Sequence, residues 1–201
     1  MRTFYRFKIL PSLKGIDKEE PPELIEQPST VKKILYILPS LKIFPHKKSQ
    51  IRLKYWIMVN FLRLSPLLAS GGSPTLADLE NLRGDGCEVV INLALPTSQD
   101  AIPAEDEHVH RMGMQYIPIP VVWENPTRQN AVDFFDAMDA CRERSVFVHC
   151  VKNMRVSAFI YLYRILRLGA DPQEAYEDMA EIWEPEGTWA EFIQSMLDRA
   201  D

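Results

Sequence analysis

Hydrophobic and polar positions fall into two alternating kinds of segment from residue 55 onward. Strands are predicted from short apolar runs bounded by turn residues, at residues 67–72, 87–93, 115–122 and 145–149. Helices are predicted from longer segments with apolar residues at helical spacing, at residues 75–86, 103–114, 125–144, 154–169, 171–183 and 188–199. This alternation indicates an α/β fold: a central, mainly parallel sheet with helices on both faces, and extra C-terminal helices.

The N-terminal part of the chain has a different character. Its first 54 residues contain six prolines, and 12 Lys and Arg against 5 Asp and Glu, whereas residues 55–201 hold 11 against 23. We expect residues 1–57 to be a basic, Pro-containing extension, partly disordered or loosely structured, with a short helix at 30–38. Such an extension is either a solvated tail or an arm that binds an acidic surface. Residues 58–201 are expected to form the folded domain, so that a chain beginning at Met58 folds on its own.

Composition excludes several classes of protein. The chain is 46% apolar and 25% charged, as in ordinary globular domains. Its three cysteines, Cys87, Cys141 and Cys150, form neither a disulfide framework nor a zinc-binding pattern. We therefore expect a cytoplasmic protein without a metal or cofactor. No apolar run is long enough to span a bilayer, and no aromatic-basic motif indicates nucleic-acid binding.

The segment Val146–Phe159, "VFVHCVKNMRVSAF", carries the chemistry. It places a cysteine where a buried strand ends and an arginine just inside the following helix. The first amides of a helix lack internal partners and carry partial positive charge, so a loop leading into them binds anions. The same field favours the thiolate form of Cys150, and Arg155 can hold two oxygens of one anion. The pattern predicts a nucleophile within an oxyanion-binding loop.

This loop requires a sharp turn before its helix, and we expect one of its residues to be left-handed. Asn153 is the candidate, because Asn is the best non-glycine residue for that conformation.

The segment and its surroundings resemble the cysteine-dependent protein tyrosine phosphatase superfamily. Within it, the likeness is to small bacterial dual-specificity-like phosphatases related to those found with β-lactamase-like hydrolases. The resemblance covers roughly residues 60–170, through "LSPLLASGGSPTLADLENLRGDGCEVVINL", "MGMQYIPIPV", "PTRQNAVDFFDAMDA" and "VFVHCVKNMRVSAF" in the family's order. It implies a three-layer, dual-specificity-phosphatase-like sandwich and a phosphatase acting on a phosphorylated protein or small molecule. Only four residues separate Cys150 from Arg155, one fewer than in the larger superfamily, and the bacterial subgroup shares this spacing.

The resemblance assigns a role to each matching position. Cys150 would be the nucleophile that forms a phosphocysteine, and Arg155 would hold the phosphoryl oxygens. His149 would orient the loop, and Ser157 would donate a hydrogen bond to the departing sulfur. The phosphate-binding amides would come from Val151, Lys152, Asn153, Met154 and Arg155. The Lys152 side chain either adds positive charge for the anion or is only exposed to solvent.

The general acid of the superfamily is usually an Asp on a loop after an earlier strand. The matching loop here is "VVWENPT", in which Glu124 is the nearest carboxylate, with Asp133 behind it. An acid in this place protonates the leaving oxygen, a contribution typically worth ~10²–10⁴ in rate.

Two alternatives stay open on the sequence alone. The six-residue loop from Cys150 to Arg155 also suits a rhodanese-like sulfurtransferase that carries a persulfide on Cys150. The absence of a loop glycine and of an Asp acid also allows a non-catalytic, phosphate-binding pseudophosphatase. The order of the flanking motifs favours the phosphatase.

Overall fold

The computed structural model describes residues 58–198. The predicted extension and its short helix lie outside these residues. The elements follow the order β1 (Leu62–Ser65), β2 (Leu68–Gly71), α2 (Leu76–Gly84), β3 (Val89–Asn92), α3 (Glu105–Arg111), β4 (Gln115–Pro118), α4 (Arg128–Ala140), β5 (Val146–His149), α5 (Met154–Leu166), α6 (Pro172–Ala180) and α7 (Thr188–Leu197).

The strands of residues 58–198 form one five-stranded sheet in the order β1-β2-β5-β3-β4. The β2–β5, β5–β3 and β3–β4 pairs are parallel, and only β1 runs antiparallel to its neighbour. His149 at the end of β5 lies in register with Gly71 on one side and Asn92 on the other. The carboxyl ends of three strands therefore meet where the candidate loop begins. The mainly parallel sheet is confirmed, whereas β1 was not predicted.

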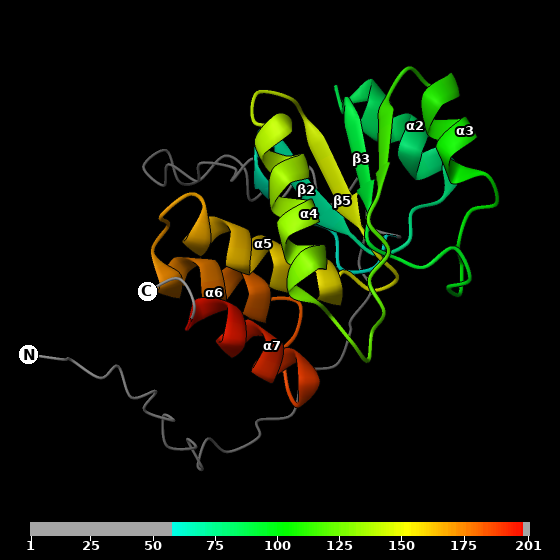
Figure 1. Cartoon of the computed structure of the whole chain (residues 1–201). Coiled ribbons are helices and arrows are strands. Elements are labelled where there is room, and N and C mark those ends of the chain that lie inside the picture. Colours follow the sequence, from blue (N-terminus) through cyan, green and yellow to red (C-terminus); the bar gives the residue numbers. More distant parts are fainter. Residues whose placement is uncertain (1–57, 199–201) are drawn as a thin grey trace, which may run out of the picture. The chain divides into compact units, whose positions relative to one another are not determined.

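The two faces of the sheet are covered by different helices (Figure 1). Val90 and Phe147 pack with buried residues of α2 and α3, such as Leu79 and Val109. Their neighbours along the strands, including Ile91 and Val148, point to the opposite face and pack with α4, α5 and α7. The period of two that defines a strand thus assigns every second residue to one of two apolar layers, as in the expected three-layer sandwich.

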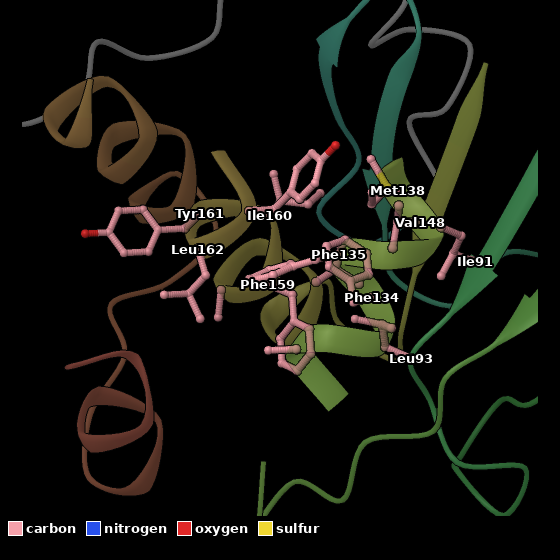
Figure 2. Packing of buried hydrophobic residues seen from close by; sticks show 14 of the residues in the cluster. Ile91, Leu93, Phe134, Phe135, Met138, Val148, Phe159, Ile160, Tyr161 and Leu162 are labelled. Atoms are coloured by element: carbon pink, nitrogen blue, oxygen red, sulfur yellow. The ribbon is translucent and has the colours of Figure 1, made fainter. Parts of the chain in front are cut away.

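Helix α5 lies at the centre of the larger layer, as Figure 2 shows for Phe159, Ile160 and Leu162. Its residues from Arg155 to Tyr163 are all buried. The rings of Phe134 and Phe159 meet edge to face with centroids 5.7 Å apart. Helices α6 and α7 cover the side of α5 that the sheet leaves open. The helix predicted at residues 154–169 is confirmed as α5, and the packing of Arg155–Tyr163 fixes its first turns beneath the loop.

Within residues 58–198, every helix is too short or too polar to cross a bilayer.

Candidate active site

A pocket of about 370 Å³ opens beside the carboxyl end of β5. Its lining comes from three places in the sequence: the loop after β3, the loop after β4, and the junction of β5 with α5. The lining residues are Ser98, Gln99, Trp123, Cys150, Val151, Lys152, Met154 and Arg155. Five of the eight belong to the predicted phosphate-binding loop, so the structure places this loop against the pocket.

The turn into α5 has the predicted conformation. Asn153 has φ of 64° and ψ of 0°, the left-handed region, and directly precedes Met154, the first residue of α5. A residue with a Cβ occupies this region at a cost, which the short polar side chain of Asn reduces. The side chain of Asn153 is fully buried and donates to the Asn60 carbonyl (2.7 Å) and to the Ser70 hydroxyl (3.0 Å). It therefore joins the loop to the β1–β2 region.

The backbone of the loop is held from the other side by the residues after β2. The Ser73 amide donates to the Val151 carbonyl (3.1 Å), and Gly72 pairs with Lys152. A Cβ on Gly72 would lie 2.7 Å from the Val151 carbonyl oxygen, closer than real Cβ atoms approach. Glycine is therefore required here, because it allows two backbone segments to touch. The Asn60 side-chain amide adds a bond to the Lys152 carbonyl (3.0 Å).

Arg155 is the most informative side chain of the site. It is only 8% exposed and lines the pocket beside Cys150. No carboxylate pairs with it among residues 58–198, and its Nε atom has no hydrogen-bond partner there. Its guanidinium lies over the Trp123 ring, 5.8 Å from the centroid. A buried cation is costly unless it is paired, so Arg155 makes the pocket suitable for an anion.

His149 directly precedes the loop and lies next to the buried carboxylate of Glu105, which the sequence analysis did not single out. Its Nε2 atom is 3.0 Å from Oε1 of Glu105, outside the alignment of a good hydrogen bond, and both side chains are buried. Oε2 of Glu105 accepts from the Asn92 amide (2.9 Å) and from the Tyr116 hydroxyl (3.1 Å). Burial and the adjacent carboxylate raise the pKa of Tyr116 far above its ordinary value, so this hydroxyl remains a donor.

A signal for Glu105 was present in the sequence. Glu105 and Val109 are four residues apart and share one face of α3, and Val109 is fully buried. A carboxylate on the buried face of a helix needs polar partners. The sequence prediction missed it because an acidic residue in the first turn is also explained by the helix dipole.

Ser157 is placed differently from the role that the resemblance implied. Its hydroxyl donates to the Met154 carbonyl (3.0 Å) and accepts from the indole N–H of Trp183 (3.0 Å). No hydrogen bond joins it to Cys150 within the described residues. The contact with the sulfur therefore stays a prediction.

The indoles that follow α6 support the pocket wall. Trp183 donates to the first turn of α5, and Trp189 donates to the Trp123 carbonyl (2.9 Å). The rings of Trp183 and Trp189 both lie against Trp123, with centroids 5.4 Å and 5.1 Å from it. The segment after α6 and the first turn of α7 thus contact both the start of α5 and the Trp123 ring next to Arg155.

The expected acids lie at the edge of this arrangement. Glu124 follows Trp123 directly but is exposed and does not line the pocket. Asp133 is exposed on α4 and accepts a hydrogen bond from Gln129. The assignment of the general acid stays a prediction.

The other two cysteines have a different environment. Cys87 and Cys141 are buried in the two apolar layers. Burial raises the pKa of both thiols above its ordinary value, so they remain protonated. Cys150 alone among the three lines the pocket.

Comparison with known proteins decides the family. The family described as DSP-PTPase phosphatase fused to NAD+ kinase matches residues 63–191. The chain belongs to this phosphatase family. The match runs from β1 into α7 and contains every residue that lines the pocket, and the predicted membership of the dual-specificity-like superfamily is confirmed.

Solved structures agree with this. A candidate phosphatase of the DUF442 group from Shewanella putrefaciens CN-32 is 30% identical, with a TM-score of 0.66, and the match covers 74% of this chain and 98% of that one. TpbA of P. aeruginosa (19% identity, TM-score 0.56, 71% and 92% covered) and PTPMT1 (17%, 0.58, 70% and 99% covered) share the fold. No curated protein matched.

Proposed function

We propose that this chain is a cysteine-dependent phosphatase that hydrolyses phosphate monoesters through a phosphocysteine. The observation that carries the proposal is the buried Arg155 guanidinium, which has no carboxylate partner in residues 58–198 and lines one pocket with Cys150. A planar guanidinium fits two oxygens of a phosphoryl group. The loop into α5 adds amides of a helix N-terminus, which favour the same anion.

The reaction follows from these positions. The Cys150 thiolate attacks phosphorus, the phosphorus–oxygen bond to the alcohol breaks, and the leaving oxygen takes a proton. Water then attacks phosphorus, the phosphorus–sulfur bond breaks, and phosphate leaves as the thiolate is restored. Arg155 and the loop amides hold the phosphoryl oxygens in both steps, where charge develops. Glu124 is proposed to supply and then remove the proton, after a movement of its loop toward the pocket.

Hydrolysis of p-nitrophenyl phosphate with EDTA present tests the proposal. The nitrophenolate leaves without a proton, so this substrate reports on Cys150 and Arg155 whether or not Glu124 is the acid. We expect turnover that disappears in Cys150→Ser and persists in the matched control Cys141→Ser, whose cysteine lies away from the pocket. Turnover that survives Cys150→Ser would contradict the proposal.

Two further comparisons separate the alternatives. If Glu124 is the acid, Glu124→Gln should lose far more on a phosphate ester of an alkyl alcohol than on p-nitrophenyl phosphate. Transfer of sulfur from thiosulfate to cyanide, faster than any phosphatase turnover, would favour the sulfurtransferase, which the six-residue loop accommodates. Phosphate binding without any turnover would indicate a pseudophosphatase.

A further inference from the structure

Lys152 distinguishes this pocket from the rest of the domain. It is the only lysine in residues 55–201, and it lies inside the phosphate-binding loop. Its side chain is exposed, and the residue lines the pocket, whereas Arg155 lies buried deeper in the same pocket. Two basic residues, one exposed and one buried, therefore line the same cavity.

The electrostatic setting makes this position unusual. Residues 55–201 hold 23 acidic against 11 basic side chains, yet no carboxylate lines the pocket. About half of the basic residues in 58–198 have acidic partners, such as Arg144 with Glu88 and Arg167 with Asp136, and the unpaired ones other than Lys152 and Arg155 do not line the pocket. Lys152 has no ion-pair partner among residues 58–198. An acidic surface repels polyanions, so this loop is where a multiply charged substrate meets positive charge.

The backbone that carries this lysine is fixed. Lys152 pairs with Gly72, and its carbonyl accepts a hydrogen bond from Asn60. The side chain of Lys152 therefore extends from a fixed backbone, and only its flexible stem has to be ordered when it binds an anion. The reacting phosphate already has Arg155 and the amides of the helix start. The Lys152 side chain is therefore available to bind a different anionic group of the same substrate.

We propose that the substrate is a phosphate monoester that carries a second negatively charged group, a second phosphate first of all, and that Lys152 binds this group. This inference rests on the proposed function. Arg155 and the loop hold the phosphate that is hydrolysed, while Lys152 selects among monoesters by what else they carry. A hydrogen bond between charged groups has the strength to produce such selection.

The test compares glucose 1,6-bisphosphate with glucose 6-phosphate by release of inorganic phosphate. We expect kcat/KM of the wild type to be higher for the bisphosphate than for glucose 6-phosphate. The ratio should exceed about two, the statistical factor for a substrate with two phosphates. In Lys152→Gln this preference should fall by about ten-fold, the ratio that one charge-assisted hydrogen bond provides.

Three controls accompany this comparison. Lys152→Arg should retain the preference. Arg128→Gln, which removes an exposed cation outside the pocket, should leave both substrates unaffected. Added salt should reduce the preference of the wild type.

Binding gives a second readout that does not need turnover. Cys150→Ser is titrated with each sugar phosphate by calorimetry, with and without Lys152→Gln, and the preference for the bisphosphate should depend on the lysine. Equal losses on both sugars in Lys152→Gln would mean that the lysine serves the reacting phosphate, and no loss on either would mean that it is only solvated. Either result overturns the inference. Failure of the proposed function is a separate result, namely no Cys150-dependent turnover of p-nitrophenyl phosphate.

Discussion

Replacing Glu105 tests whether the network behind the loop supports the site. Its carboxylate is 7% exposed, accepts hydrogen bonds from the Asn92 amide and the Tyr116 hydroxyl, and lies 3.0 Å from the His149 ring. His149 is the last residue of β5 and directly precedes Cys150. Glu105→Ala removes the acceptor from these two donors and the carboxylate beside the His149 ring.

The expected loss of stability follows from these contacts. A buried polar group that loses its partner costs about 1–3 kcal/mol, and two donors lose theirs here. Asn92 keeps a hydrogen bond with the Tyr116 hydroxyl (2.9 Å), so the two losses do not add in full, but the truncated buried side chain adds to them. We expect Glu105→Ala to lower the free energy of unfolding by about 3–5 kcal/mol, a large part of the ~5–15 kcal/mol typical of a domain.

Thermal unfolding followed by circular dichroism measures this change. At about 2–4 °C per kcal/mol for a chain of this size, the midpoint should fall by roughly 6–20 °C. Glu105→Gln keeps the shape and one acceptor oxygen, so its midpoint should lie between those of the wild type and Glu105→Ala. The matched control is Glu107→Ala on the same helix, which removes an exposed carboxylate 3.9 Å from Arg111. Exposed pairs of this kind contribute about 0–1 kcal/mol.

Turnover supplies the second measurement. Loss of the carboxylate frees the His149 ring, so hydrolysis of p-nitrophenyl phosphate should fall in Glu105→Ala at temperatures where the variant is still folded. If Glu105→Ala and Glu107→Ala unfolded within about 1 kcal/mol of one another, the network would carry no stability and the reasoning would be wrong.

Three further substitutions test how the loop is held. Gly72→Ala places Cβ 2.7 Å from a loop carbonyl and should reduce turnover by roughly 10²-fold, whereas Gly84→Ala meets nothing within 4 Å and should not. Asn153→Ala loses the side-chain hydrogen bonds and keeps a Cβ at φ of 64°, which costs about 1–2 kcal/mol relative to glycine; Asn153→Gly should therefore be more stable in urea than Asn153→Ala, and the reverse order would contradict this. Trp183→Phe removes the indole N–H bonds to the start of α5 and should cost about 1 kcal/mol, so an unchanged melting curve would count against that role.

Much of the fold could be predicted because it depends on local patterns. The strands and helices from β2 onward were recognised from apolar runs and helical spacing, and their alternation determines a mainly parallel sheet. Strand β1 was missed because the alternation of "LRLS" spans only four residues at the edge of the sheet, and its leucines are only half-buried. It is a strand because its backbone pairs with that of β2.

The chemistry of the site was determined by residues that are neighbours in sequence. Cys150, Arg155 and the left-handed Asn153 lie on one short strand–loop–helix segment, whose geometry follows from its own backbone. The supports of that segment come from elsewhere in the chain: Asn60 before β1 and Glu105 on α3. A hydrophobic pattern assigns a residue to a face but does not say which distant side chain it meets there. Only the packing of the layers brought a first-turn acid to His149, because the pairing of two buried polar groups depends on where separate elements end in space.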